Sequence, residues 1–401
     1  MISVEEASAR ILATFTPVGA ETVALAEAAG RISAAPVIAR TTQPPADVSA
    51  MDGFAVRAEE ARGGAALRLI GSAPAGHPFA GSVGAGETVR IFTGSFIPAG
   101  ADAVLLQEDA DAEEGGVRVR ETVRPGQHIR RMGQDFAHGD VVIAAGRRLS
   151  SRDIGLAAAA DHPWLLVHRR PRVAVLATGD EIALPGEPIP PGGIVSSNAH
   201  ALAAMVAALG GAPSVLPIAA DDTEAIGRAA DAARGFDLLL TTGGISVGAH
   251  DLVQEGLARR GLAVDFWKIA MRPGKPLMFG RLGEMPVLGL PGNPVAAFVC
   301  ALLFARPALL RLAGLAVAPL PTTTAETATA LGANDRRFDF LRARLEEDAA
   351  GRLVATAFAV QDSAMQAVLA RADALILRPP HAPAVAAGAA VEIVRFDRLG
   401  L

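Results

Sequence analysis

Strand-like and helix-like segments alternate along the chain from Arg172 to Ala313. Short apolar runs such as "RVAVLATGDEI" and "FDLLLTTGG" are each followed by a segment with the apolar periodicity of a helix. This alternation is typical of a mostly parallel sheet that helices cover on both faces. The rest of the chain is expected to form further domains, because 401 residues exceed what one hydrophobic core usually organises.

The segments on either side of this α/β region have other patterns. Residues 3–35 predict an amphipathic helix, in which Ala7, Ile11 and Leu12 are apolar. Between residues 65 and 123, glycine and proline separate short apolar stretches, which indicates a small β-rich domain. Beyond Leu320 the pattern is again typical of strands, and "RLEEDAAGRLVATAF" predicts a hairpin.

Charge and cysteine content argue against several classes of protein. The formal net charge is −5 without a long basic run, which disfavours non-specific nucleic-acid binding. The single cysteine, Cys300, allows no internal disulfide, and its apolar neighbours indicate a buried thiol. The apolar run around it is too short to span a bilayer, and the N-terminus is acidic where a signal peptide is basic. We therefore expect a cytoplasmic protein with no membrane and no nucleic-acid partner.

Three polar loops follow predicted strands of the α/β region. Ligands bind outside the carboxyl ends of parallel strands, so these loops are expected to meet at one sheet edge. Glycine lets the backbone approach a ligand closely, and consecutive N–H groups near a helix N-terminus bind anions. Each loop alone is equally well explained as a tight turn, but the three together favour a phosphate-containing ligand. The candidate binding residues are Thr178, Gly179, Asp180, Thr242, Gly243, Gly244, Ser246, Gly248, Pro291, Gly292, Asn293 and Pro294.

Acidic residues lie at the same predicted edge. Glu181, Asp221 and Asp251 each fall at or just after a predicted strand end. Carboxylates repel a phosphate unless a cation bridges them, and Mg²⁺ is commonly held by one or two carboxylates together with substrate phosphates. The alternative is that these acids cap the helices that follow. Capping fits Asp222 best and Glu181 least, because glutamate is a poor N-cap.

A basic segment, "FWKIAMRPGKP", adds Lys268, Arg272 and Lys275. If residues 268–272 are extended, Lys268 and Arg272 lie on the same face. In isolation such a run is typical of a solvated edge strand, but beside the three loops it favours binding of an oxyanion or a phosphate. The chain has no P-loop motif, and "GGISVG" lacks the spacing of a dinucleotide fingerprint. A P-loop NTPase and a dinucleotide-binding enzyme are therefore disfavoured.

Eight motifs, taken in order, resemble the molybdopterin molybdenumtransferase family, which includes bacterial MoeA and the E domain of gephyrin. They are "SAMDGFAVRA", "RIFTG", "GADAVLLQED", "GQHIRRMGQDF", "LATGDEI", "TTGGISVGAHD", "FWKIAMRPGKP" and "LGLPGNPVAA". The resemblance covers nearly the whole chain and implies an α/β multidomain fold. The implied domains are an elongated, mostly helical domain (1–42 plus 128–168), an inserted β-rich domain (43–127), an α/β molybdopterin-binding domain with a mostly parallel sheet (169–316) and a C-terminal β-barrel (317–401).

The resemblance also implies a reaction. Members of the family cleave the pyrophosphate of an adenylylated molybdopterin, release AMP and place molybdate on the dithiolene sulfurs, with Mg²⁺ assisting. The positions that match the family's functional acids and threonine are Asp52, Thr93, Asp135, Glu181, Asp221 and Asp251. Of these, Glu181, Asp221 and Asp251 are implied to be the metal ligands. The basic segment and the proline loop 291–294 are implied to bind substrate, together with Ser363 in the barrel.

The family forms an extended dimer, and the resemblance implies a site shared between the two chains. Asp52 and Thr93 of one chain would then meet the α/β domain of the other. The molybdopterin adenylyltransferase, and molybdoenzyme apoproteins or their chaperones, are candidate partners. This chain departs from the family where Arg272 stands in place of a frequent lysine, because a guanidinium is a planar fork and an ammonium a point charge.

Two other functions stay open at this point. The α/β domain alone resembles the molybdopterin adenylyltransferase, which performs the preceding step, and gephyrin suggests a scaffold role. The extra domains and the chain length argue against the first alternative. The crowded polar site argues against the second, because a scaffold would not need its acids.

Overall fold

A six-stranded sheet organises the α/β region, with the strand order β16-β13-β17-β21-β20-β18. Its parallel strands are β16 (Ala212–Val215), β13 (Arg172–Ala177), β17 (Leu238–Thr242) and β21 (Met285–Leu290). β20 (Pro276–Leu282) and β18 (Leu262–Lys268) extend the sheet in antiparallel fashion. The connections that join these last strands are too short to hold a crossover helix, so they reverse the chain direction. The expected fold class, a mostly parallel α/β sheet with further domains, is confirmed. The computed structural model describes residues 1–243 and 252–400, so Gly244, Ser246, Gly248 and Asp251 lie outside the described residues.

Helices cover both faces of this sheet. Val173 and Val175 of β13 belong to a core that the helices of the first face complete. These are α1 (Val4–Thr14), α4 (Asn198–Ala208), α7 (Pro294–Cys300) and α8 (Arg306–Leu312). The alternate residues Ala174 and Leu176 belong to a second core, with α5 (Thr223–Ala232) and α6 (Leu252–Ala258). Alternation of side chains along one strand therefore divides the apolar residues between the two layers.

The expectation that the apolar run around Cys300 is too short to span a bilayer is wrong, because the helical run continues past Arg306. Pro294–Leu312 is long and apolar enough to cross a membrane by length and composition, but most of it is buried in the first core. A π-helical segment (Ala301–Ala305) joins α7 to α8. Cys300 is fully buried there, and burial raises the pKa of its thiol. The expected buried thiol is confirmed, and this run is a core helix.

The expected helix over residues 3–35 is wrong beyond Thr14. After α1 the chain forms β1 (Ala20–Ala24), which pairs antiparallel with β12 (Trp164–His168), and the short α2 (Leu25–Ala28). Pro17 has no N–H to continue a helix, and Gly19 favours a turn, so the periodic pattern spans two different elements. Ser3 caps α1 by accepting the N–H of Glu6 at 3.1 Å.

The elongated region combines short helices with paired strands. Beside β1, β12 and α2 lie α3 (Ser151–Ala159) and the antiparallel pair of β2 (Val37–Ile38) and β11 (Val141–Ile143). Val23, Ile143 and Leu165 form its small core. The antiparallel pair of β3 (Val48–Ser49) and β10 (Ile129–Arg130) leads from this region into the inserted β domain.

The inserted β domain is one sheet with the strand order β7-β4-β6-β5-β9-β8. Its strands are β4 (Gly53–Val56), β5 (Ala66–Ala73), β6 (Glu87–Ile91), β7 (Ala103–Leu106), β8 (Ala110–Glu113) and β9 (Gly116–Val119). Small apolar cores form on both sides of the sheet, around Leu105 and around Ile91. The β-rich character expected between residues 65 and 123 is present.

Five strands close the C-terminal barrel, because β23 pairs with both β24 and β25. They are β22 (Thr323–Thr327), β23 (Phe338–Glu347), β24 (Leu353–Ala357), β25 (Ala374–Arg378) and β26 (Ala390–Arg395). The predicted hairpin is confirmed as the antiparallel pair β23–β24. A strand from the α/β region, β19 (Met271–Arg272), adds to the barrel sheet beside β23.

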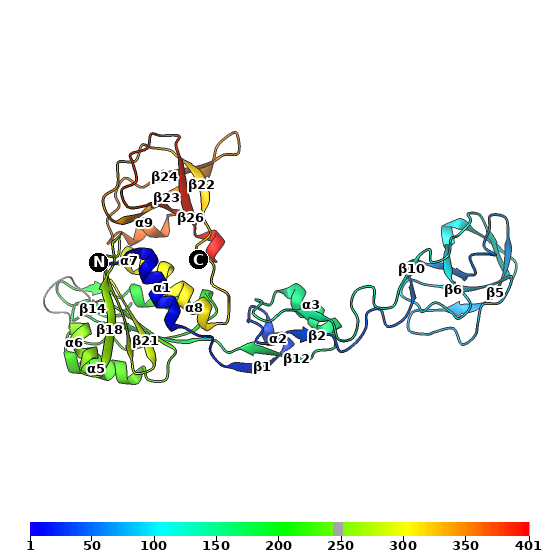
Figure 1. Ribbon diagram of the computed structural model, residues 1–401, viewed down its shortest axis with the longest axis horizontal. Coiled ribbons are helices and arrows are strands. Elements are labelled where there is room, and N and C mark those ends of the chain that lie inside the picture. The colour runs from blue at the N-terminus through cyan, green and yellow to red at the C-terminus, as the bar shows by residue number, and fades with distance from the viewer. Residues whose placement is uncertain (244–251, 401) are drawn as a thin grey trace.

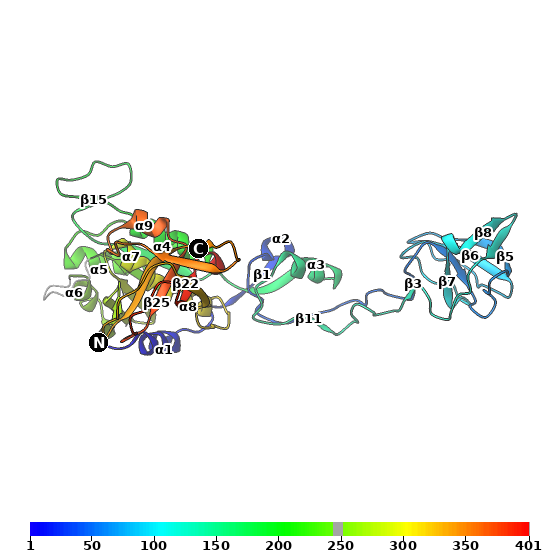
Figure 2. The ribbon, with the colours of Figure 1, turned by 90° about the horizontal axis from the view of Figure 1, so that it is seen from above.

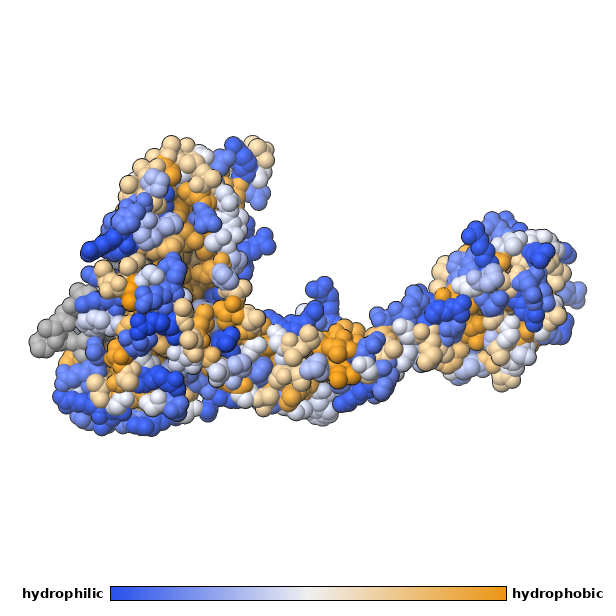
Figure 3. All heavy atoms as spheres, viewed as in Figure 1, coloured by the Kyte–Doolittle hydropathy of each residue, from blue (hydrophilic) through white to orange (hydrophobic). Residues whose placement is uncertain are grey.

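The molecule is drawn out along one axis (Figure 1). The α/β region and the barrel lie at one end, the elongated region follows, and the inserted β domain lies at the far end. The same arrangement is clear from above (Figure 2), where a loop beside β15 (Ile194–Val195) projects from the α/β region. β15 pairs with β14 (Ile182–Ala183), and α9 (Gln366–Ala370) belongs to the C-terminal part of the chain. A space-filling view shows apolar atoms gathered in the hollow between the barrel and the α/β region (Figure 3).

Candidate active site

Three loops meet at the carboxyl ends of adjacent parallel strands. β13, β17 and β21 are neighbours in the sheet, so the residues that follow them lie side by side. A cavity of about 650 Å³ opens there and is lined by residues of all three segments, among them Glu181, Thr242, Gly243 and Asn293. This is the arrangement that the glycine-bearing loops predicted.

A hydrogen-bonded bridge ties two of these loops together. The amide of Asn198, the first residue of α4, donates to Thr242 Oγ1 at 2.9 Å and to the carbonyl of Gly292 at 2.7 Å. Thr242 Oγ1 in turn donates to the carbonyl of Pro291 at 3.2 Å. Asn198 was not predicted from the sequence, because an asparagine at the start of a helix is equally typical of a cap.

Two buried threonine hydroxyls next to the cavity residues have no partners. Thr178 follows β13 and Thr241 lies within β17, and within residues 1–243 and 252–400 neither hydroxyl has a hydrogen-bond partner. Neither residue lines the cavity itself, but each adjoins a lining residue, Ala177 or Thr242. Buried polar groups are nearly always satisfied, so these two hydroxyls mark this part of the sheet as unusual. A Cβ on Gly243, whose φ is 88°, would lie 2.4 Å from the carbonyl of Thr178. Glycine is therefore required for these two loops to approach each other.

Acidic side chains crowd the same edge. The backbone N–H of Asp221 donates to the carboxylate of Asp180 at 3.0 Å. The pKa of Asp221 is raised, first because nearby protein atoms remove part of its hydration and then because Asp180 and Glu181 are also negative. Asp222 accepts the N–H of Ala225 at 2.8 Å, so its expected role as a helix cap is confirmed. In the described part of the chain, no three acidic, histidine or cysteine side chains lie close enough to hold a metal ion by themselves.

The basic segment does not form one extended face. β18 ends at Lys268, whose ammonium lies 4.3 Å from the centre of the Trp267 ring, and the chain then turns away from the sheet. Arg272 lies in β19, which pairs with the barrel, so the expected common face with Lys268 is wrong. Over the described residues, neither Lys268 nor Lys275 has an ion pair, and each is half-buried.

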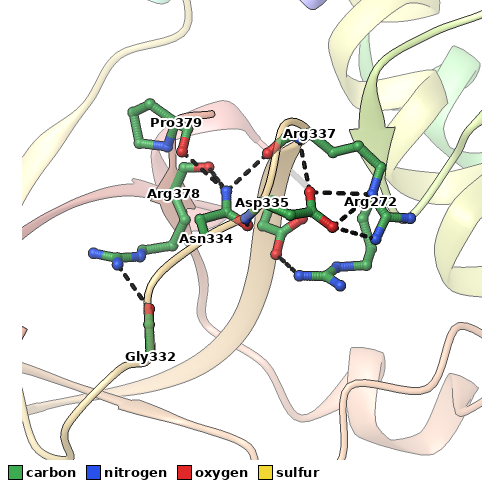
Figure 4. Close-up of polar contacts among 8 residues, drawn as sticks. Arg272, Gly332, Asn334, Asp335, Arg337, Arg378 and Pro379 are labelled. Atoms are coloured by element: carbon green, nitrogen blue, oxygen red, sulfur yellow. Dashed lines mark hydrogen bonds and ion pairs between the residues drawn. The ribbon is translucent and has the colours of Figure 1, made fainter. Parts of the chain in front are cut away.

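Arg272 forms an ion pair with Asp339 of the barrel strand β23. The Asp339 carboxylate is almost completely buried, with 5% of its side chain exposed, whereas about half of the Arg272 side chain reaches solvent. The pair fixes the guanidinium while most of its five N–H donors stay available to an oxyanion. Figure 4 shows Arg272 beside Asp335 and Arg337, and Arg337 together with Arg272 lowers the pKa of Asp335 to about 2.

The barrel reaches the proline loop through Ser363. Its hydroxyl accepts the Asn293 amide at 2.8 Å, and its carbonyl accepts the N–H of Val295 at 3.0 Å. The buried guanidinium of Arg342 donates to Gln361 at 3.2 Å and to the carbonyl of Val360, and so supports the segment that carries Ser363. Arg342 was not predicted from the sequence, because only the folded barrel brings it to this segment.

The remaining predicted residues lie away from the cavity. Asp52 and Thr93 are adjacent in the inserted β domain, where the N–H and hydroxyl of Thr93 donate to Asp52 at 2.7 and 2.8 Å. These bonds lower the pKa of Asp52. Asp135 is exposed on the connection that follows β10. Within one chain the inserted β domain, which holds Asp52 and Thr93, lies at the opposite end of the axis from the α/β region that holds the cavity (Figure 1).

Three family models together match most of the chain. The MoeA N-terminal region (domain I and II) matches residues 2–160, the probable molybdopterin binding domain matches 174–311 and the MoeA C-terminal region (domain IV) matches 324–396. The molybdopterin molybdenumtransferase of Haemophilus influenzae is 33% identical over the full length of both chains. The chain belongs to the molybdopterin molybdenumtransferase family.

Further relatives agree with this membership. Molybdopterin molybdenumtransferase 2 of Mycobacterium tuberculosis is 36% identical and covers 93% of this chain, which spans 94% of that protein. The crystal structure of a molybdopterin biosynthesis MoeA protein from Pyrococcus horikoshii superposes with a TM-score of 0.87 at 29% identity, over 99% of both chains. The resemblance in the motifs is thereby confirmed, and molybdenum cofactor biosynthesis is the process in which this transferase acts.

Membership of the family decides between the functions that the motifs left open. The molybdopterin binding model spans all three loops, the basic segment and α4. The N-terminal and C-terminal models add Asp52, Thr93 and the barrel residues Asp339 and Ser363. Relatives that match over their full length carry the transferase name, so the adenylyltransferase alternative would leave both outer regions unexplained.

Proposed function

We propose that the chain inserts molybdate into adenylylated molybdopterin in a Mg²⁺-dependent reaction that releases AMP. The observation that carries this proposal is the cavity at the carboxyl ends of β13, β17 and β21. Glycine-bearing turns and Glu181 line it. The same sheet edge, outside the lining, holds the crowded Asp221, two lysines without an ion pair in the described residues, and orphaned threonine hydroxyls. An adenylylated pterin offers a pyrophosphate that needs both donors and a neutralising cation.

Within this proposal, each group of residues has a separate task. The loop N–H groups and the hydroxyl of Thr178 bind the phosphate oxygens. Lys268 and Lys275 add positive charge, because neither is neutralised by a carboxylate among the described residues. Arg272 binds molybdate, since its pairing with Asp339 orients the guanidinium and leaves a bidentate edge free.

The carboxylates suit a hard divalent cation. The pKa of Asp221 is raised first by loss of hydration and then by the negative charges of Asp180 and Glu181, and a bound cation would relieve both effects. Oxygen ligands of this kind are those that Mg²⁺ prefers, together with substrate phosphates. Glu181 and Asp221 would hold it, with Asp251 as a further ligand. When bound, Mg²⁺ neutralises negative charge on the pyrophosphate.

A complete site is proposed to need two chains. Asp52 and Thr93 lie far from the cavity of their own chain, and both are exposed. In a two-fold dimer, the inserted β domain of each chain would meet the cavity of the other. Asp135 belongs to the same contributed group. The molybdopterin adenylyltransferase, and apoproteins or chaperones that accept the cofactor, are proposed as further partners in the cytoplasm.

The experiment that tests this proposal supplies adenylylated molybdopterin, Mg²⁺ and molybdate to the purified protein and measures AMP. We expect AMP release that requires all three components. ATP consumption with molybdopterin as substrate is the control for the adenylyltransferase alternative. Absence of molybdate-dependent AMP from the folded protein would contradict the proposal.

A further inference from the structure

A second cavity lies at the junction between the elongated region and the α/β region. It has a volume of about 210 Å³ and sits at the amino ends of the sheet strands, beside Pro171 and Gly210. The candidate active site is at the carboxyl ends of the same strands, on the other side of the sheet. The second cavity is therefore separate from the site described above.

Basic side chains dominate the walls of this cavity. Arg31, Arg148, His168, Arg169 and Arg170 line it, and no acidic residue of the described chain does so. This concentration is unusual in a chain whose formal net charge is −5. A cavity lined by one sign of charge concentrates ions of the opposite sign.

Only part of this positive charge is compensated. Arg31 is paired with Glu21, and Arg169 is paired with Asp237 through two contacts of 2.5 and 2.7 Å. Arg148 and Arg170 have no ion pair within residues 1–243 and 252–400. Two guanidiniums at the cavity thus have no carboxylate partner.

A further guanidinium, which does not line the cavity, lies near Arg148. Arg306 of α8 has a buried Nε without a hydrogen-bond partner in the described residues. Its pKa is lowered, first by burial and then by repulsion from Arg148. Arg306 and Arg148 are therefore close enough to repel each other, and a bound anion would relieve that repulsion.

The end of helix α4 does not explain these arginines. Ala207 to Gly210 line the cavity, and the C-terminus of a helix carries a partial negative charge that attracts cations. That partial charge is equivalent to about half an elementary charge. It offsets less than one guanidinium, so net positive charge is left over.

We propose that this cavity binds a phosphate-class anion, either inorganic or as the terminal phosphate of a nucleotide. Guanidiniums bind phosphate oxygens through paired N–H donors. Neither Arg148 nor Arg170 has a carboxylate partner in the described residues, and Arg148 uses only Nη1, which donates to the carbonyl of Gly30 at 3.4 Å. The volume is below the range of about 300–1,000 Å³ of drug-sized ligand sites, so it fits phosphate or pyrophosphate but not a whole nucleotide. Any nucleoside part would lie outside the cavity.

Such an anion would link two parts of the molecule. Arg31, Arg148 and His168 come from the elongated region, whereas the end of α4 and Ala313 come from the α/β region. One ligand bound between them would stiffen the junction that sets the direction of the elongated region. The proposal is independent of the reaction at the carboxyl-end cavity, because it uses none of the residues assigned to that reaction.

Calorimetric titration of the full chain with pyrophosphate tests the proposal. The measurements use a Lys275→Gln background, so that anion binding at the carboxyl-end cavity is weakened. In this background we expect saturable binding that the added pair Arg148→Gln and Arg170→Gln weakens by about tenfold or more per arginine. Arg228→Gln, which removes an exposed charge on α5, is the matched control and should leave the affinity unchanged.

The outcomes distinguish binding at this cavity from a general attraction of anions to positively charged surface. No saturable binding in the Lys275→Gln background, or equal weakening by Arg228→Gln, would overturn the proposal. Thermal unfolding checks that the variants are folded. If the double variant is unstable, Arg170→Gln alone replaces it, and we expect this single change to weaken pyrophosphate binding about tenfold. Separate titrations with inorganic phosphate and with AMP distinguish the two sources. Phosphate binding that the cavity variants abolish would identify the free ion, and AMP binding that they abolish would identify the nucleotide.

Discussion

The two ends of this elongated molecule hold their predicted catalytic residues in opposite states. At the far end, which is the inserted β domain, the carboxylate of Asp52 accepts two hydrogen bonds from Thr93 within the same domain. At the near end, which holds the α/β region and the barrel, orphaned threonine hydroxyls adjoin the cavity residues, and the pKa of Asp221 is raised by loss of hydration and by neighbouring carboxylates. The pKa of Asp52 is lowered, whereas that of Asp221 is raised.

The difference indicates which end of the chain binds the substrate and which end contributes residues to the site of another chain. A preformed, exposed pair such as Asp52 and Thr93 needs no ligand to be stable. The near end has polar groups that gain most from a ligand and a cation, because buried unsatisfied groups and clustered charges are costly. Substrate is therefore expected to bind at the near end, and the far end is expected to complete the site of a partner chain.

The largest effect is expected at Asp251. If it helps to hold the cation at the near end, Asp251→Asn should lower AMP release about 100-fold or more, since a neutralising cation contributes several kcal/mol to a transition state. The rate is measured at saturating Mg²⁺, with unfolding as a check on the fold. Asparagine caps helices as well as aspartate does, so retained turnover would indicate that Asp251 acts only as a helix N-cap.

A tenfold effect is expected at Asn198. Asn198→Ala removes the bridge between Thr242 and Gly292, so the phosphate-binding loops lose their common anchor. We expect the half-saturating concentration of the adenylylated pterin to rise about tenfold, in line with the loss of two hydrogen bonds. His200→Ala, on the exposed side of the same helix, is the control. An equal change in both variants would contradict the role of the bridge.

A smaller and more selective effect is expected at Arg272. Arg272→Lys keeps the charge beside Asp339 but loses the fork, so the molybdate concentration for half-maximal insertion should rise severalfold. Binding of the adenylylated pterin should barely change. Arg337→Lys alters the neighbouring pair with Asp335 and should affect neither substrate. If Arg272→Lys weakens the binding of molybdate and of the adenylylated pterin equally, Arg272 binds the pterin phosphates instead.

The smallest effect concerns pH and Asp221. Its pKa is higher in the fold than in the unfolded chain, so ionisation destabilises the fold above the folded pKa and has no effect below the unfolded pKa. Asp221→Asn should raise Tm by roughly 1 °C at about pH 7 and leave it unchanged near pH 3. Asp222→Asn keeps its cap and is the matched control. A rise at acid pH alone would contradict the assignment.

The sequence predicts the near end well because the chemistry there is local. Each loop follows its own strand, and alternation from β13 to β21 is enough to bring Thr178, Thr242 and Pro291 to one edge. The bridge from Asn198 and the support from Arg342 were not predicted. Both depend on packing between segments that are distant in sequence, and neither residue type is distinctive by itself.

Other errors have the same physical origin. The apolar pattern of residues 3–35 continues through Pro17. Before Pro17 its apolar side chains pack into the α/β core, and after it the chain pairs with β12, so one continuous pattern covers a helix and a strand. Lys268 and Arg272 are four residues apart, yet one ends a strand of the central sheet and the other joins the barrel. The partner Asp339 is 67 residues from Arg272 along the chain. The expected domain limits and the roles of individual site residues stay predictions.

The central claim is that each working site joins the far end of one chain to the near end of another. Complementation between Asp52→Ala and Asp251→Ala tests it most directly, after co-expression or joint refolding so that the chains re-pair. Each variant alone should be nearly inactive. Random pairing of equal amounts makes half of the dimers mixed, and each mixed dimer has one intact site, so AMP release should recover to roughly a quarter of the wild-type rate. Mixed dimers, verified by differential tagging, that show no activity above the separate variants would contradict the shared site.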